Sequence, residues 1–220
     1  MNKINQYIKN GCKGDLDLNN SDIQSLPKEL TYVEGNLNLS FCKSLTSLPD
    51  NIQVGGGLSL YGCESLTSLP DNLEVGANLI LWNCTSLTSL PDNLEVGGDL
   101  NLSSCKNLTS LPDNLKVSRN LNLGGCKSLT SLPDNLEVGG VLDLGYCTSL
   151  TSLPDNLKVG GSLNLRYCTS LTSMPDTLYV KGNIYVDETF NANPYRKEVL
   201  FIKALNGEQV PTIEGEITVE

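Results

Sequence analysis

The sequence predicts an α/β repeat fold, a solenoid of about eight coils with a parallel β-sheet on its concave face, an irregular convex side and a cap at each end. Three patterns that share a period of 21 residues predict it. A proline in the frame Ser-Leu-Pro, once Ser-Met-Pro, recurs at positions 49, 70, 91, 112, 133, 154 and 175. A Leu-x-Leu pair and a cysteine recur with the same spacing. Such self-similarity is typical of stacked coils that pack only against their neighbours.

The Leu-x-Leu pair predicts the strand of each coil. Leu121 and Leu123, for example, point to the same side of an extended chain, so one face of the strand is buried. A unit of 21 residues cannot bury this face alone. Coils stacked about 4.8 Å apart join their leucines into one continuous core. We expect this solenoid to cover residues 15–186.

The proline turn and the glycine pairs predict the rest of the coil. Proline donates no ladder hydrogen bond and Pro-Asp-Asn favours a turn, so the side opposite the strand is expected to be irregular. Pairs such as Gly97-Gly98 fit the corner that returns to the strand, where a positive φ or a close approach is needed. Ser118-Arg119 fills this corner once, so one coil manages without glycine.

Both ends are expected to be capped, because an open solenoid end is an unpaired sheet edge. In the N-terminal cap, residues 1–14, Ile4, Tyr7 and Ile8 recur at helical spacing and predict a short helix.

The C-terminal cap is expected to span residues 187–220. Asn193-Pro194 indicates the start of a helix, and an apolar run follows it. The alternation over residues 216–220 is typical of an edge strand.

Aligned on its leucines, the unit is L-x-L-x-x-C-x-S-L-T-S-L-P-D-N-L-x-V-G-G-x. It resembles the leucine-rich repeat, with cysteine in the slot that takes Asn or Cys. The short unit with Leu-Pro is similar to the bacterial subtype found in secreted effectors. Its segment L-P-D-N-L-x-V-G-G is similar to the repeats of small repeat proteins of bacteria and phages. This resemblance implies a scaffold rather than an activity. The ubiquitin-ligase domain of such effectors is not expected, because residues 187–220 hold no catalytic cysteine.

A three-sided parallel β-helix is the alternative architecture. Its sides would be the segments L-x-L, S-L-T-S-L and L-x-V of each unit.

Composition narrows the classes of partner and site. Fifteen basic and 25 acidic residues give a net charge of −10 without histidine, which disfavours nucleic acid and anionic membranes. The N-terminus lacks the apolar run of a secretory signal, so we expect a cytoplasmic protein, with delivery as an effector left open. No motif for a nucleophile, a phosphate or a dinucleotide occurs. We therefore expect no enzyme, no cofactor and no metal.

Four polar or thiol columns accompany the leucines. Seven cysteines at 21-residue spacing predict a ladder of buried thiols, and Cys12 lies outside this frame. The aspartates after the prolines are expected to cap their own turns, with cation binding as the alternative. The Ser and Thr columns of the S-L-T segment predict two rows of hydroxyls, which suit ice binding or self-association.

Variable positions on the exposed side of the strand predict the binding surface. Six of the twelve aromatic residues of the chain gather there, among Asn, Ser and Gly, which is the composition of a recognition surface. The candidate binding residues are Phe41, Tyr61, Ile80, Trp82, Asn101, Asn122, Tyr146, Arg166 and Tyr167.

We therefore expect a non-catalytic module that binds a protein or peptide through the variable concave strand face. The acidic chain favours a partner with basic patches. A glycan is a further candidate, since stacked aromatic residues beside Asn and Asp suit sugar rings. The alternative from another class is a surface-array protein, meaning ice binding or self-association through the Ser and Thr columns.

Overall fold

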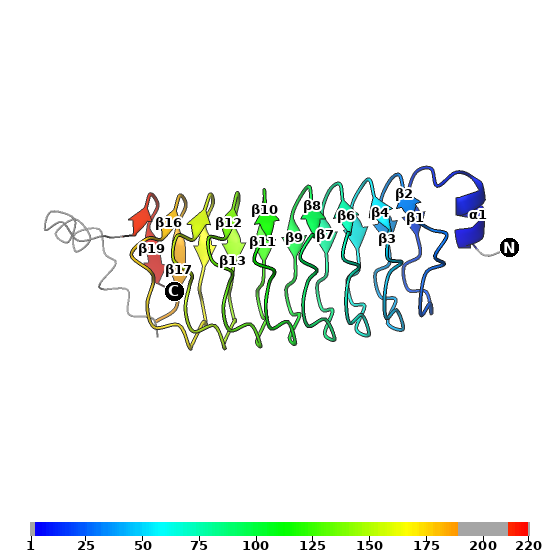
Figure 1. Ribbon diagram of the computed structural model, residues 1–220. Coiled ribbons are helices and arrows are strands. Elements are labelled where there is room, and N and C mark those ends of the chain that lie inside the picture. The colour runs from blue at the N-terminus through cyan, green and yellow to red at the C-terminus, as the bar shows by residue number, and fades with distance from the viewer. Residues whose placement is uncertain (1–2, 189–210, 220) are drawn as a thin grey trace, which may run out of the picture.

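The computed structural model describes residues 3–188 and 211–219 and is a β-solenoid, as predicted, with its coils stacked in one row (Figure 1). One side of the row is a parallel sheet of ten strands in the order β1-β3-β5-β7-β9-β11-β13-β15-β17-β19. These are β1 (Leu16–Asp17), β3 (Leu37–Asn38), β5 (Leu58–Ser59), β7 (Leu79–Ile80), β9 (Leu100–Asn101), β11 (Leu121–Asn122), β13 (Leu142–Asp143), β15 (Leu163–Asn164), β17 (Ile184–Val186) and β19 (Ile217–Val219).

A second side of the coil also carries strands and is more regular than the sequence indicated. Its four-stranded sheet holds β2 (Tyr32–Val33), β4 (Gln53–Val54), β6 (Glu74–Val75) and β8 (Glu95–Val96), and its five-stranded sheet holds β10 (Lys116–Val117), β12 (Glu137–Val138), β14 (Lys158–Val159), β16 (Tyr179–Val180) and β18 (Thr212–Ile213). The Ser-Leu-Thr side carries no strand within residues 3–188. Two strand-bearing sides agree with the predicted solenoid and also with the β-helix alternative.

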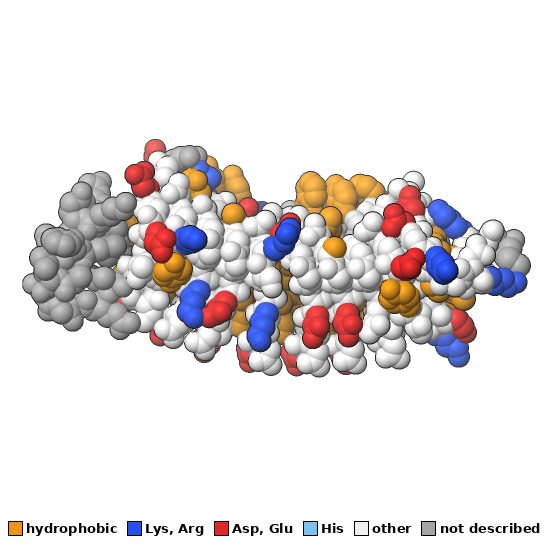
Figure 2. All heavy atoms as spheres, turned by 90° about the horizontal axis from the view of Figure 1, so that it is seen from above, with side chains coloured by type: hydrophobic (Ala, Val, Ile, Leu, Met, Phe, Trp, Pro, Cys, Tyr) orange, Lys and Arg blue, Asp and Glu red, His pale blue; other side chains and the backbone are white. Residues whose placement is uncertain are grey.

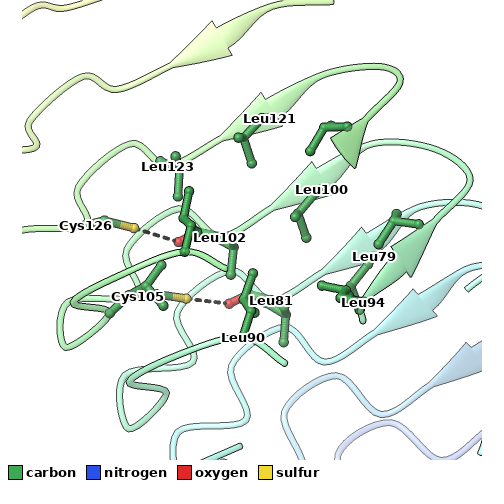
Figure 3. Close-up of a cluster of buried hydrophobic side chains, with 14 of the residues drawn as sticks. Leu79, Leu81, Leu90, Leu94, Leu100, Leu102, Cys105, Leu121, Leu123 and Cys126 are labelled. Carbon is green, nitrogen blue, oxygen red and sulfur yellow. Dashed lines mark hydrogen bonds between the residues drawn. The ribbon is translucent and has the colours of Figure 1, made fainter. Parts of the chain in front are cut away.

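The core consists of columns of identical residues. Leu121 lies in register between Leu100 and Leu142, and all three are fully buried. Figure 3 shows Leu79, Leu100 and Leu121 along one such column. Burying a leucine contributes about 1.5–3 kcal/mol. Since the columns repeat in each coil, each added coil repeats these stabilising contacts.

Cross-coil hydrogen bonds also hold the corner that follows the glycines. The Asn120 side-chain oxygen accepts the Val141 N–H at 2.8 Å, and the Asp99 carboxylate accepts the Asn120 N–H at 3.1 Å. A polar side chain at this position therefore replaces a strand ladder where the chain turns.

The corner glycines are required by close approach rather than by a positive φ. A Cβ on Gly97 would lie 2.3 Å from the carbonyl oxygen of Gly76, and one on Gly139 would lie 2.1 Å from that of Ser118. Ser118 stands at this corner without glycine, and here the second side divides, because β8 ends one sheet and β10 begins the other. The side chain that sequence reasoning noted as an exception thus coincides with a break in hydrogen bonding.

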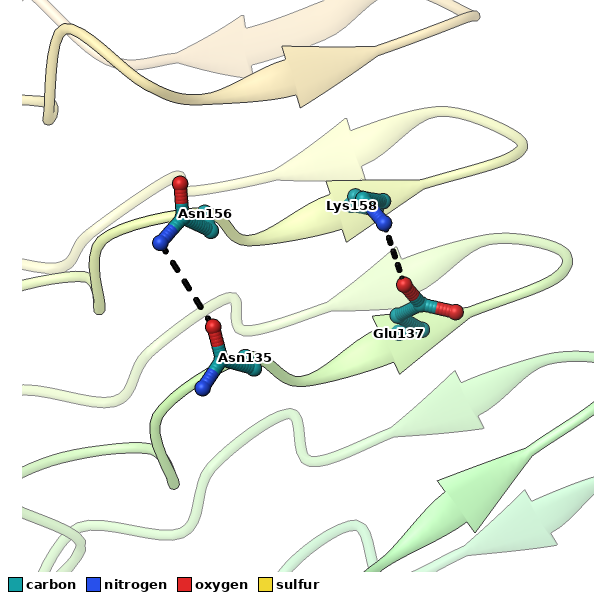
Figure 4. Close-up of polar contacts among 4 residues, drawn as sticks. All are labelled: Asn135, Glu137, Asn156 and Lys158. Atoms are coloured by element: carbon teal, nitrogen blue, oxygen red, sulfur yellow. Dashed lines mark hydrogen bonds and ion pairs between the residues drawn. The ribbon is translucent and has the colours of Figure 1, made fainter.

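Outward side chains on the second side pair from coil to coil (Figure 4). Lys158 of β14 forms an ion pair with Glu137 of β12, and its hydrogen bond lowers the pKa of the Glu137 carboxyl. The Asn156 amide group donates to the Asn135 side-chain oxygen at 3.5 Å. Such exposed contacts fix register more than they stabilise the fold.

Helix α1 (Lys3–Lys9) covers the first coil. Its Ile4 is buried in the core, and the Tyr7 hydroxyl lies 2.7 Å from the Cys12 carbonyl oxygen and 2.8 Å from that of Gly14. It is the one helix in the described part of the chain, and no helix there is long and apolar enough to cross a membrane.

The last strands extend the solenoid. Thr212 of β18 pairs with Tyr179, and Ile217 of β19 pairs with Ile184, so the chain adds one more coil with the same register. β19 lies within the stretch where the sequence indicates an edge strand. The helix expected after Asn193-Pro194 lies outside the described residues.

Candidate functional site

The candidate site begins where each strand of the ten-stranded sheet ends. In the seven coils that carry the cysteine, two residues separate it from the second leucine, and the latter of the two has a positive φ. These seven residues are Phe41, Gly62, Asn83, Ser104, Gly125, Tyr146 and Tyr167, with φ between 60° and 77°. Their N–H groups continue the cross-coil hydrogen bonds, as when Tyr146 donates to the Arg166 carbonyl at 2.8 Å. We call this line of residue pairs the strand edge.

Aromatic residues at the left-handed positions are costly. A residue with a Cβ loses about 1–2 kcal/mol in this conformation, whereas glycine loses nothing. Gly62 and Gly125 suit the position, but Phe41, Tyr146 and Tyr167 do not. These three side chains are also 43%, 54% and 44% exposed, so core packing does not offset the cost. Backbone strain of this kind concentrates at functional sites.

The rings at the strand edge form two groups. The N-terminal aromatic group consists of Phe41, Tyr61 and Trp82, with ring centroids 4.5 Å apart for the first pair and 4.7 Å apart for the second, which is stacked. The C-terminal aromatic group consists of Tyr146 and Tyr167, stacked at 4.4 Å. Figure 2 shows two raised groups of hydrophobic side chains along one edge of the molecule.

The contacts of the C-terminal group fix its geometry. Tyr167 donates its N–H to the buried carboxylate of Asp187, and the Arg166 guanidinium lies 4.8 Å from the centre of the Tyr185 ring. Desolvation and the neighbouring Tyr167 raise the pKa of the Tyr146 hydroxyl above its ordinary value.

A stretch of small residues lies between the aromatic groups, and we call it the saddle. It consists of Ser103, Ser104, Gly124, Gly125 and Gly145. Figure 2 shows the surface dipping between the two raised groups. Trp82, which stacks on Tyr61, and Tyr146, which stacks on Tyr167, stand at the two ends of the saddle.

The polar residues between the two leucines of the Leu-x-Leu pairs support the saddle. Asn101 accepts the Ser103 N–H at 3.0 Å and Asn122 accepts the Gly124 N–H at 2.9 Å. Asp143 accepts the Gly145 N–H at 2.9 Å in the same way. These side-chain oxygens close a local turn, so part of each side chain has a structural role.

The predicted binding residues all lie along this edge or beside it. The structure places Phe41, Tyr61 and Trp82 together, and half-buried Ile80 beside them lines a shallow pocket of about 270 Å³. Tyr146 and Tyr167 are brought together separately.

Asn101 and Asn122 lie between the two aromatic groups, and Arg166 faces Tyr185. Sequence reasoning missed Asp143, although it stands in the same column as Asn122.

The thiol column is buried and reduced. All seven cysteines of the frame are free and at most 5% exposed, and each donates to a leucine carbonyl of the preceding coil at 3.0–3.2 Å. Figure 3 shows two of these bonds, from Cys105 to Leu81 and from Cys126 to Leu102. Burial raises the pKa of the Cys105 thiol to about 12, so these thiols are poor nucleophiles.

The aspartate, serine and threonine columns face solvent. The proline turn is closed by its backbone, as in the bond from Leu73 N–H to the Pro70 carbonyl at 3.2 Å, and the aspartate after each proline is exposed. The Thr109 hydroxyl donates to the Thr88 carbonyl at 3.3 Å. Within residues 3–188 and 211–219 no three potential ligands gather to hold a metal ion.

No protein-family model matches the chain, and neither the curated proteins nor the solved structures contain a match.

Proposed function

We propose that this chain is a leucine-rich-repeat protein of the short bacterial type and acts as a non-catalytic binding module through its strand edge. One observation carries the proposal. Aromatic side chains occupy strained, exposed positions at which Gly62 and Gly125 show that the coil needs no ring. Stability alone disfavours such residues, so we infer that recognition retains them.

Preorganisation is the mechanism that these contacts support. Tyr61 is held between Phe41 and Trp82, and Tyr146 is stacked on Tyr167. Cross-coil hydrogen bonds hold the backbone beneath the rings. A ligand therefore meets aromatic groups that lose little conformational freedom on binding.

The shape of the edge favours an extended partner. The two aromatic groups and the saddle run across seven successive coils, which is about 29 Å at the spacing of parallel strands. A protein segment or a glycan chain has such a length, whereas a compact metabolite needs an enclosed pocket.

Differential capture tests the proposal. The native chain and a Trp82→Ser/Tyr146→Asn variant are immobilised and exposed to a lysate of the source organism. Each substitution copies a residue from the same frame position of another coil, Ser103 or Asn83, so the fold is retained. We expect proteins or glycans that the native chain retains and the variant does not.

The matched control is Tyr32→Ala, because Tyr32 is 44% exposed but lies on the second side of the coil. Its capture should equal that of the native chain. Equal capture by the double variant, or no capture by the native chain, would contradict the proposal. In that case self-association or ice binding through the Ser and Thr columns becomes the function to measure.

A further inference from the structure

The two ends of the saddle are aromatic faces. Tyr146 stacks on Tyr167 with one face, so its other face looks across Gly125 of the preceding coil. Trp82 stacks on Tyr61, so its other face looks across Ser103 of the following coil. The two rings stand three coils apart, or about 14 Å at the spacing of parallel strands.

Side-chain oxygen atoms line the floor of the saddle at Gly124 and Gly125. A Cβ on Gly124 would lie 3.2 Å from the Asn122 side-chain oxygen and 3.6 Å from Oδ2 of Asp143. A Cβ on Gly125 would lie 3.5 Å from the Ser104 hydroxyl. The glycines therefore leave room above a carboxamide, a carboxylate and a hydroxyl.

Charges around the saddle are mixed. Asp143 contributes a half-buried carboxylate, whereas Lys106 and Lys127 are exposed and follow the cysteines of two of the three saddle coils. A strongly cationic ligand would meet the lysines, and a strongly anionic one would meet Asp143. A neutral ligand with many hydroxyls avoids both conflicts, since a hydroxyl donates to a carboxylate and accepts from an ammonium group.

We propose that the saddle binds a neutral oligosaccharide, with one sugar ring stacked on Tyr146, another stacked on Trp82 and hydroxyls bonded to Asp143. This proposal rests on the proposed function and names its ligand class. The C–H face of a pyranose carries partial positive charge and suits the negative face of an aromatic ring. Parallel coils present their donors and acceptors at a regular spacing, which suits the repeat of a glycan chain.

A glycan array of neutral oligosaccharides tests the proposal. The native chain is compared with Tyr146→Asn and Asp143→Asn, both of which copy residues from the same frame positions, Asn83 and Asn122. Asparagine at 143 keeps the oxygen that accepts the Gly145 N–H and removes only the carboxylate. Asp99→Asn is the control, because Asp99 lies at the glycine corner, where Asn120 stands in the next coil.

We expect a subset of the array to bind the native chain and the control equally, and each saddle variant at least tenfold more weakly. For the sugars that bind, Trp82 is the only tryptophan in the chain, so its fluorescence should change and saturate. An array without binding, or binding that both saddle variants retain, would overturn the glycan assignment.

The two proposals fail in different ways. An unglycosylated protein captured only by the native chain, together with a negative array, leaves the binding module in place and removes the oligosaccharide. No differential capture together with a negative array removes both.

Discussion

The Cys105 thiol donates a hydrogen bond to the Leu81 carbonyl oxygen, 3.1 Å away in the preceding coil. The same bond recurs down the column, so each thiol satisfies a carbonyl at the end of a strand while filling the core. A buried donor that meets a buried acceptor removes a desolvation penalty of about 1–3 kcal/mol. The cysteine column is therefore structural.

Thiol alkylation should distinguish Cys12 from the column. Cys12 is half-buried, whereas the other seven cysteines are buried. Iodoacetamide followed by mass spectrometry should show one modified cysteine in the native chain and all eight after denaturation. Rapid labelling of a second cysteine in the native chain would show that a coil opens.

Alkaline pH should destabilise the fold. Burial raises the pKa of the Cys105 and Cys147 thiols to about 12, whereas a thiol in the unfolded chain has a pKa of about 8.5. The folded chain then binds more protons than the unfolded chain. The contribution of the buried thiols to the free energy of unfolding is complete below about pH 8.5. It is lost as the pH rises towards 12, by about 1.4 kcal/mol per pH unit for each thiol.

The measurement is the urea midpoint at about pH 8 and about pH 10.5, on either side of the ordinary thiol pKa. A Cys105→Ala/Cys147→Ala variant keeps the tyrosines and lysines, so it isolates the thiol contribution. Its midpoint should fall less steeply with pH than that of the native chain. Parallel pH dependence of the two chains would show that the thiols do not contribute.

Substitution at the glycine corner should depend on the coil. A Cβ on Gly160 would lie 2.3 Å from the Gly139 carbonyl oxygen, so Gly160→Ala should lower the free energy of unfolding by about 1–3 kcal/mol. Ser118→Ala at the same frame position should change it by less than about 0.5 kcal/mol, because the side chain there is already accommodated. Urea denaturation measures both, and equal losses would contradict the close-approach explanation.

Replacing a glycine at a left-handed position of the strand edge should lower the stability of the fold. Gly125 has φ +77° and its Cβ would have an ordinary contact at 3.5 Å, so Gly125→Ala tests backbone strain alone. We expect a loss of about 1 kcal/mol in the free energy of unfolding. Ser104→Ala is the control, since Ser104 already carries a Cβ at φ 60°. An unchanged stability in Gly125→Ala would show that the strand edge adopts another conformation.

Much of the fold follows from periodicity. The 21-residue repeat places leucines such as Leu100 and Leu121 in columns, because a unit this short cannot bury its apolar face alone. The same spacing buries the cysteines, and helical spacing predicts the short helix at Ile4. These are local or repeated patterns, which can be recognised from the order of residues in a single sequence.

The last coil shows where such patterns end. Thr212 pairs with Tyr179 at a separation of 33 residues rather than 21, so a search for the constant period misses it. The segment has a glycine, Gly215, shortly before its apolar strand, as most of the other coils do. This glycine is the feature of the sequence that indicates a further coil.

The candidate site depends on tertiary structure for a different reason. Composition places aromatic residues beside the strands, but it does not reveal the left-handed backbone of Phe41 and Tyr146 or the stacking of Tyr61 on Trp82. These features arise because cross-coil hydrogen bonds set the backbone, and the backbone then brings side chains from separate coils within contact distance. Periodicity therefore determines which residues share a column, whereas the stacked coils decide which side chains face one another across an open surface.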